Sequence, residues 1–223
     1  ETNVIIGADG NDGVCRMQAG NIDQNSNKKF IYRGTLSAKK NNRALFQSSV
    51  NLWLNDGWHL VYYPYSKFNC LNLILVGKSS IEKLNESTQE EFKKLHNVEW
   101  KPVKTSKISS EAIYNIGQIF LIGDAAHPIY PHLAQGAAQT FLDGFTLFKV
   151  LSSNDDINIS LIDYAKIRTA TISRAKDMSY LSGEVFKAKG TIAKIRNKLL
   201  LNDYLDLENF LNKVWEKDSP LNK

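Results

Sequence analysis

Residues 119–139 carry the most informative pattern of the sequence and read Ile-Phe-Leu-Ile-Gly-Asp-Ala-Ala-His-Pro-Ile-Tyr-Pro-His-Leu-Ala-Gln-Gly-Ala-Ala-Gln. The first four residues are apolar and predict a short buried strand that ends at Gly123 and Asp124. Pro128 and Pro131 predict a stiff loop, because proline fixes its own backbone and removes a hydrogen-bond donor. The residues after this loop predict a helix. The expected order is therefore strand, loop and helix.

This order places a set of small and polar residues where α/β sheets bind ligands, at the carboxyl end of a strand. Gly123 permits a close approach of the backbone, and Asp124 can accept hydrogen bonds from sugar-like hydroxyls. Ala125 and Ala126 leave room for a ligand. The helix is expected to begin at Gln135, and the free N–H groups of a helix start favour an anion.

Upstream of this stretch the sequence favours strands. Residues 3–6 predict a short strand that must pair with another part of the sheet, since an unpaired edge is a liability. Alternating apolar residues then predict an antiparallel sheet with one wet face, and Asn55-Asp56-Gly57 predicts a tight hairpin within it. The expected strands are residues 30–34, 44–47, 50–54, 58–64 and 71–76.

Downstream the sequence favours helices. Phe141, Phe145 and Phe148 form an apolar stripe on the helix that follows the loop, and we expect this stripe to lie in the core. The other expected helices are residues 87–96, 161–181, 192–201 and 205–215. Because strands and helices do not alternate regularly, the fold class predicted is α+β.

Composition excludes several classes of function. The formal net charge is +5 and the isoelectric point is about 9.0, but the lysines are scattered, so we expect no nucleic-acid partner. The sequence contains no apolar run long enough for a membrane span, and we expect no stable membrane insertion. Cys15 and Cys70 form no metal motif and fit a reducing cytoplasm, although a disulfide between them stays open. We expect no metal site, because His127 and His132 lack a further ligand at usable spacing.

Two motifs carry a resemblance to a known family. Gly123-Asp-Ala-Ala-His-Pro128 with Pro131-His-Leu-Ala-Gln-Gly-Ala137 resembles the second FAD-binding motif of class A flavoprotein monooxygenases, in particular the group similar to salicylate hydroxylase. Residues 7–16, with Asp9, Gly10 and Arg16, resemble the family's Asp-Gly motif, although Asn11-Asp12-Gly13 departs from its usual pattern. Tyr164 and Arg168 stand where the family has its Tyr-Glu-x-x-Arg helix, with Ala165 in place of Glu.

The resemblance implies the following site. FAD would contact Gly123, Asp124, Ala125, Ala126, Pro131, Gln135, Gly136 and Ala137, with Asp9, Gly10 and Arg16 near its pyrophosphate. His132 would be the catalytic residue that takes a proton from a phenol; the alternative is a loop histidine bonded to backbone. His127 is expected to order the loop. His59 and Tyr62 face the predicted sheet, where packing is the better interpretation.

The implied function is hydroxylation of a small aromatic substrate that resembles salicylate or hydroxybenzoate, with NAD(P)H and O2 as co-substrates. Two alternatives stay open: a ring hydroxylase of ubiquinone synthesis or another flavin monooxygenase, and an inactive truncated fragment that binds FAD weakly or not at all. The sequence holds no Gly-x-Gly-x-x-Gly motif for the ADP half of FAD. Two protein partners stay open: a missing N-terminal half, which would supply that motif, and a second copy of the chain in a homodimer.

The expected domains follow from these motifs. We expect a remnant of an FAD-binding, Rossmann-like α/β domain at residues 1–27 and an antiparallel-sheet substrate domain at 28–110. The second FAD-binding segment would occupy 111–151, and a helical region 152–223.

Overall fold

The computed structural model describes residues 3–18, 30–37, 49–65, 69–77, 98–103 and 112–201. The chain divides into two compact units, each of which brings together distant parts of the sequence. The first unit comprises Glu1–Ser26, Ser106–Glu184 and Leu199–Lys223, and the second comprises Asn27–Thr105 and Val185–Lys198. The expected strand at 44–47 and the expected helices at 87–96 and 205–215 lie outside the described residues.

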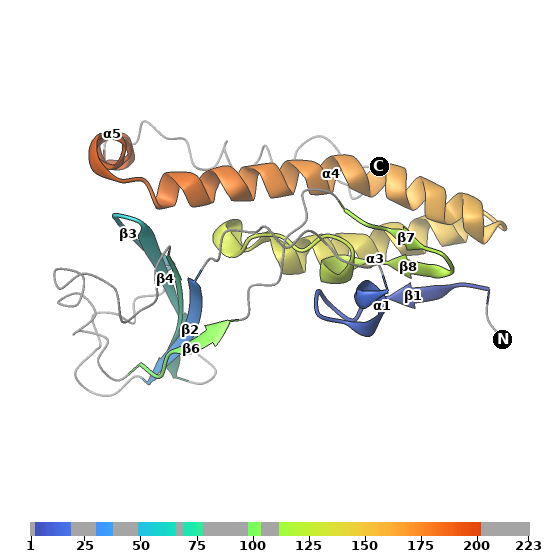
Figure 1. Ribbon diagram of the computed structural model, residues 1–223, viewed down its shortest axis with the longest axis horizontal. Coiled ribbons are helices and arrows are strands. Elements are labelled where there is room, and N and C mark those ends of the chain that lie inside the picture. The colour runs from blue at the N-terminus through green and yellow to red at the C-terminus, as the bar shows by residue number, and fades with distance from the viewer. Residues whose placement is uncertain are drawn as a thin grey trace. The chain divides into compact units, whose positions relative to one another are not determined.

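The first unit contains a small mixed sheet. Its strands are β1 (Ile5–Gly7), β7 (Asn115–Ile116) and β8 (Ile119–Leu121), in the order β1-β8-β7. β1 runs parallel to β8, so that Gly7 lies opposite Leu121, and β7 pairs with β8 in the antiparallel sense. The start of the chain and the strand before Asp124 are therefore neighbours, as Figure 1 shows. This pairing gives β1 the partner that its sequence required.

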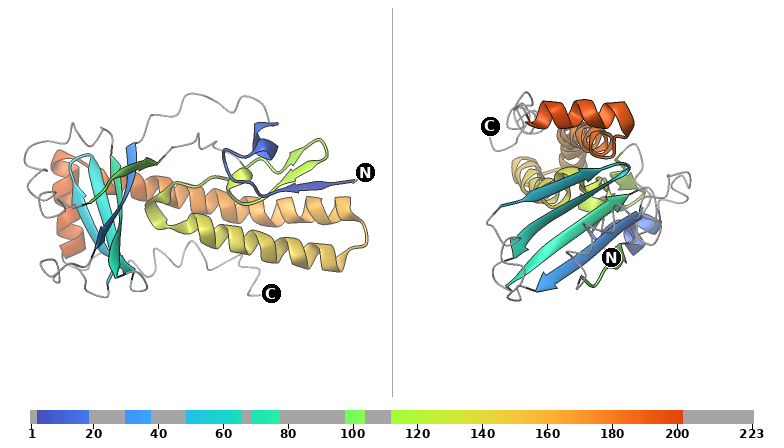
Figure 2. Two further views of the ribbon diagram at one scale, coloured as in Figure 1. Left: turned by 90° about the horizontal axis from the view of Figure 1, so that it is seen from below. Right: turned by 90° about the vertical axis from the view of Figure 1, so that its left-hand side faces the viewer.

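Two long helices complete the first unit. α3 (Gln135–Ser153) is followed by α4 (Ile157–Phe186), and the two run antiparallel as a hairpin (Figure 2). The Asp156 carboxylate accepts a hydrogen bond from the Asn158 N–H over 2.7 Å and so caps the first turn of α4. The Ser160 hydroxyl donates to the Val150 carbonyl over 3.0 Å, which ties the two helices together beside the turn.

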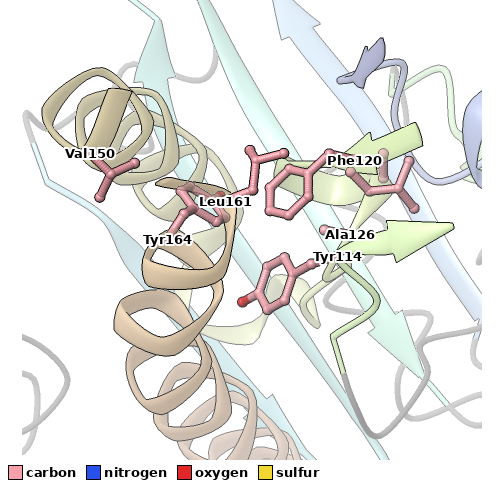
Figure 3. Packing of buried hydrophobic residues seen from close by; sticks show 8 residues of the cluster. Tyr114, Phe120, Ala126, Val150, Leu161 and Tyr164 are labelled. Carbon is pink, nitrogen blue, oxygen red and sulfur yellow. The ribbon is translucent and has the colours of Figure 1, made fainter. Parts of the chain in front are cut away.

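The core of the first unit joins the sheet to both helices. Tyr164 of α4 lies edge-on to Tyr114 and Phe120, with ring centroids 5.7 and 5.3 Å apart. Figure 3 shows these rings packed together with Ala126, Val150 and Leu161. Since β8 delivers Phe120 to this cluster, aromatic packing fixes the strand whose end carries Gly123 and Asp124.

The expected burial of the phenylalanine stripe on α3 is wrong for Phe141 and Phe148, whereas Phe145 is half-buried. Phe141 and Phe148 are 81% and 67% exposed, whereas Leu142, Thr146 and Val150 face the interior. The exposed phenylalanines and the packed residues of α3 lie more than a third of a turn apart, and the packed face is the one that also holds Asp143. Periodicity detects an apolar stripe but cannot decide which of two stripes is covered.

The second unit contains an antiparallel sheet of five described strands. The strands are β2 (Phe30–Ser37), β3 (Asn51–Asn55), β4 (Trp58–Tyr65), β5 (Cys70–Gly77) and β6 (Lys101–Val103). They are ordered β3-β4-β5-β2-β6 (Figures 1 and 2), and Asp56-Gly57, with Gly57 at a φ of +85°, forms the expected hairpin between β3 and β4. His59 and Tyr62 are buried, in agreement with the packing interpretation. α5 (Gly190–Leu201) follows α4.

The second unit has its own core. It consists of leucines and aromatic residues that alternate along neighbouring strands, which is the pattern of a sheet with one covered face. The buried members are Leu36, Trp58, Leu60, Tyr62, Leu71, Leu73 and Leu75. Helices beside mixed and antiparallel sheets confirm the α+β class. Cys15 and Cys70 are free thiols, and among the described helices none is both long and apolar enough to cross a membrane.

Candidate functional site

A tight turn follows β8 and forms the centre of the candidate site. Gly123 has a φ of +60° and opens the short 3-10 helix η4 (Gly123–Ala125). A Cβ atom at this position would lie 3.2 Å from the side chain of Thr140, so both the backbone angle and the limited space favour glycine. The Gly123 carbonyl accepts hydrogen bonds from the N–H groups of Ala126 and His127, each over 2.9 Å.

Asp124 is the exposed residue of this turn and faces the start of α3. Its carboxylate lies 3.7 Å from the position that a Cβ atom would take at Gly136. Ala134, the residue before α3, has a left-handed φ of +54° and makes no side-chain cap. The first N–H groups of α3 are thus left without a capping side chain, beside an open carboxylate.

A buried ionic cluster lies behind the turn, and sequence reasoning missed its central member. The Asp143 carboxylate accepts hydrogen bonds from the Gly123 N–H over 2.8 Å and from Arg168 Nε over 2.7 Å, and lies 2.6 Å from His127 Nε2. Arg168 also donates to the side chain of Gln139 over 2.7 Å. These four side chains are at most 1% exposed. The sequence signal that could have identified Asp143 is a single carboxylate among apolar residues on one face of α3.

The charge balance of this cluster favours an ionised Asp143. Burial by itself raises the pKa of Asp143, because desolvation penalises the charged carboxylate. The hydrogen bond and charge of His127 and the guanidinium of Arg168 outweigh burial, and they hold the pKa of Asp143 below its ordinary value. The carboxylate is therefore charged near neutral pH and acts as an acceptor only.

Arg16 connects the Asp-Gly motif to the same turn. It lies on the short helix α1 (Val14–Met17), is 2% exposed and donates from Nη1 to the carbonyl of Ala125. Burial lowers the pKa of Arg16, and the charge of Asp124 opposes that shift. Its Nη2 atom is buried and has no hydrogen-bond partner within the described ranges. Arg16 thus carries a spare donor close to Asp124.

Asp9 and Gly10 shape the loop that presents Arg16. The Asp9 carboxylate accepts a hydrogen bond from the Cys15 N–H over 2.8 Å, and this bond lowers the pKa of Asp9. Gly10 has a φ of +81°, and its carbonyl accepts from the Gly13 N–H over 3.2 Å. A Cβ atom at Gly13 would collide with the Asp9 carboxylate. The structure therefore engages Asp9 with its own loop.

The two histidines of the loop lie in different surroundings. His127 belongs to the Asp143 cluster. His132 is 7% exposed, lies on the 3-10 helix η5 (Pro131–Leu133) and stacks on Tyr130 at 5.8 Å. Its ring also lies so close to Gly183 of α4 that a Cβ atom there would come within 2.3 Å of it. Among the described residues, no three His, Cys, Asp or Glu side chains gather as a metal site would require.

The other expected contact residues lie around the turn and the helix start. Ala125 and Ala126 are buried, Ala137 and Pro131 are exposed, and Gln135 is buried at the first position of α3. The Gln135 amide nitrogen donates to the Leu133 carbonyl over 3.2 Å. The structure thus brings the residues of the 123–137 stretch and Arg16 into one region, whereas Asp9 and Gly10 contribute through the loop that carries Arg16.

Comparisons with known proteins find similarity to FAD-binding proteins and to aromatic hydroxylases. A family described as an FAD binding domain matches residues 77–175. The chain is 29% identical over 217 residues to 3-hydroxybenzoate 6-hydroxylase 1 of Aquipseudomonas alcaligenes, which covers 88% of this chain and 55% of that protein. It is 26% identical over 212 residues to 3-hydroxybenzoate 6-hydroxylase of Polaromonas naphthalenivorans, with 87% and 53% covered. The chain therefore spans about half the length of these relatives.

A solved structure shares the fold. The crystal structure of Klebsiella pneumoniae HpxO, complexed with FAD and uric acid, matches with a TM-score of 0.74. The match covers 98% of this chain and 60% of that one, at 14% sequence identity. At this identity the likeness concerns the fold alone.

Proposed function

We propose that this chain is part of a class A FAD-dependent aromatic-ring monooxygenase and that the whole protein hydroxylates a small aromatic substrate. In the proposed reaction the aromatic ring, NAD(P)H, O2 and a proton yield the hydroxylated ring, NAD(P)⁺ and water. Bound FAD would supply the redox chemistry that links NAD(P)H to O2. The relatives named for 3-hydroxybenzoate support a substrate that combines a ring with a carboxylate or a hydroxyl.

The observation that carries this proposal is the pairing of Asp124 with the open start of α3. A carboxylate is an acceptor for the hydroxyls of a ribityl chain. The uncapped N–H groups next to Gly136 suit the negative charge that develops on a reduced flavin. Ala125 and Ala126 add no bulk, and a side chain at Gly136 would fill the space beside the Asp124 carboxylate. The residues present therefore fit FAD.

Arg16 supports the proposal from the other motif. Its Nη2 atom is buried without a partner in the described part of the chain, which is costly for a charged group unless a ligand completes its hydrogen bonds. A pyrophosphate is the part of FAD whose charge suits a guanidinium. In this proposal Arg16 donates to the pyrophosphate while its Nη1 atom holds the carbonyl of Ala125.

We assign the proton-accepting role to His132. An imidazole changes its charge near neutral pH, and the removal of a phenol proton makes the ring electron-rich. His132 lies three residues before α3, within the loop that joins the Asp124 turn to the helix start. Its contacts with Tyr130 and Gly183 fix the orientation of the ring.

The proposal requires a further segment for the ADP half of FAD. None of the 13 glycines is arranged as Gly-x-Gly-x-x-Gly, and the relatives are nearly twice as long as the matched region. We propose that an N-terminal FAD-binding half completes the site.

Turnover by the completed protein tests the proposed function. The chain is joined to the N-terminal half of the Aquipseudomonas relative, and NAD(P)H oxidation, O2 uptake and product formation are followed with 3-hydroxybenzoate, salicylate and 4-hydroxybenzoate. Hydroxylated product formed in proportion to NAD(P)H consumed is the expected result. FAD-bound protein that yields no product from any small aromatic acid or phenol would contradict it.

A further inference from the structure

The turn after β8 is held at both ends by one oxygen atom. Oδ2 of Asp143 accepts the Gly123 N–H over 2.8 Å and lies 2.6 Å from His127 Nε2. The Gly123 carbonyl in turn accepts the His127 N–H over 2.9 Å. Gly123, Asp143 and His127 therefore close a ring of hydrogen bonds around residues 123–127, and Asp124 is the exposed residue inside that ring.

The ring matters because glycine alone does not hold a backbone conformation. Gly123 has a φ of +60°, and glycine populates many other conformations at little cost. Arg168 holds the other oxygen of Asp143 over 2.7 Å and is itself held by Gln139, one helical turn before Asp143 on α3. The carboxylate is thus fixed by α4 on one side and fixes the turn on the other.

We propose that Asp143 is a positioning residue for the flavin site, which holds the Gly123 turn so that the Asp124 carboxylate faces Gly136. This inference rests on the proposed function for its ligand, FAD. Asp143 does not itself reach the ligand: it is fully buried, and its acceptor atoms are committed to Gly123, His127 and Arg168. Its effect on FAD passes through the backbone of Gly123.

Asp143→Asn is the sharpest variant. Asparagine keeps the shape but offers a single acceptor oxygen, whereas Gly123 and Arg168 each present a donor to a different oxygen. Leu142→Ala is the matched control, because Leu142 is the neighbouring residue on α3, is 7% exposed and donates to none of these groups. Leu142→Ala therefore destabilises the unit by loss of packing alone.

The first readout needs no ligand. Amide hydrogen exchange is measured by NMR, and the rate at Gly123 is divided by the rate at Leu121, whose N–H donates to the Tyr114 carbonyl over 2.7 Å. Global unfolding exposes both amides and leaves this ratio unchanged. Asp143→Asn is expected to raise the ratio about tenfold or more, as the loss of a charge-assisted hydrogen bond implies. Leu142→Ala is expected to leave it unchanged.

The second readout is FAD affinity, followed by quenching of flavin fluorescence. Asp143→Asn is expected to weaken FAD binding about tenfold or more, and Leu142→Ala less than about threefold at a comparable loss of thermal stability. If Asp143→Asn does not fold, His127→Ala takes its place. It opens the ring but leaves the bonds of Asp143 to Gly123 and Arg168, so smaller effects in the same directions are expected.

An unchanged exchange ratio in Asp143→Asn overturns the inference, whatever FAD does. Equal losses of FAD affinity in Asp143→Asn and Leu142→Ala also overturn it, because they would trace the effect to stability. Failure of the protein completed by an N-terminal half to bind FAD, together with a raised ratio in Asp143→Asn, overturns the proposed function and the flavin part of the inference. The raised exchange ratio would still support the conclusion that Asp143 holds the turn in place.

Discussion

Single residues in this chain derive their roles from backbone geometry. Asp124 is exposed, and its exposure by itself would suggest a solvated side chain. Its turn starts at a left-handed glycine and ends on a buried histidine, and this held backbone is the basis of the acceptor role that we propose for Asp124. The sequence predicted Asp124 through its neighbours, but it did not predict Asp143, because the contacts of Asp143 join residues 16 to 25 positions apart.

Gly183 is expected to be required for the placement of His132. Gly183→Ala puts a Cβ atom within 2.3 Å of the His132 ring, so the ring must move, at a cost of about 1–3 kcal/mol in the free energy of unfolding. Gly144→Ala is the control: it lies in α3 with open space around it and should stabilise by about 0.5–1 kcal/mol. Urea denaturation measures both, and equal effects of the two changes would contradict the packing of His132 against α4.

His132→Asn is expected to abolish proton acceptance without affecting the binding of FAD. In the protein completed by an N-terminal half, turnover of a phenolic substrate should fall about 10²–10⁴-fold. The fall of turnover on the acid side of the pH profile should vanish with it, because asparagine does not titrate in that range. Steady-state kinetics from pH 5 to 9 measure this. A variant that keeps the acid-side fall and loses turnover equally at every pH would assign His132 a structural role instead.

Asp143 should make folding stability depend on pH. Because the folded pKa of Asp143 lies below its ordinary value near 3.8, the charged carboxylate stabilises the folded chain above about pH 4. This contribution is lost as the pH falls through the folded pKa. Asp143→Asn should cost roughly 3–5 kcal/mol at pH 7, since it leaves Arg168 buried and unpaired.

The gap in free energy of unfolding between the unsubstituted chain and Asp143→Asn should narrow below pH 4. Urea denaturation at pH 7, 4 and 3 measures it, with Leu142→Ala as a control whose cost should not change with pH. A gap that stays constant down to pH 3 would mean that folding does not lower the pKa of Asp143.

For helices and strands, local sequence patterns predicted where each element lies and whether it is a helix or a strand. They were poorer at predicting which face of an element is buried and which strand it pairs with. The Asp56-Gly57 hairpin, the strand before Gly123 and the helices in 135–201 follow from turn chemistry and periodicity alone. The parallel pairing of β1 with β8 joins residues more than a hundred positions apart, and no local signal names that partner. The wrong assignment of the phenylalanine stripe has the same origin, because the covered face of α3 is chosen by α4 and β8.

Phe141 and Phe148 should therefore contribute little to the stability of this chain. Phe141→Ser and Phe148→Ser are expected to change the free energy of unfolding by less than about 0.5 kcal/mol each, because both side chains are largely exposed. Leu142→Ala, on the packed face, should cost about 2–4 kcal/mol. Thermal and urea denaturation compare the three, and a large cost for either serine variant would show that the outer face is covered in solution.

For the whole molecule, the fold class and the resemblance to a family follow from short motifs, whereas the site depends on how distant segments meet. The motif at 123–137 supplies Asp124 and the helix start, the N-terminal segment supplies Arg16 through β1 and α1, and α4 supplies Arg168 behind the turn. The order of these segments along the chain is visible in the sequence. Their convergence on the end of β8 is a property of the fold.

The most direct test of the central claim is a titration of the purified chain with FAD, followed by flavin fluorescence and the visible spectrum, with Asp124→Ala as the matched variant. Asp124 is exposed, so the substitution should leave the thermal unfolding temperature unchanged. The proposed site predicts saturable quenching and a structured flavin spectrum for the unsubstituted chain, with an affinity about tenfold or more weaker in Asp124→Ala. Equal binding by both proteins would contradict the assignment of the ribityl site to Asp124. No binding by either protein, even after an N-terminal half completes the FAD site, would contradict a flavin site in this chain.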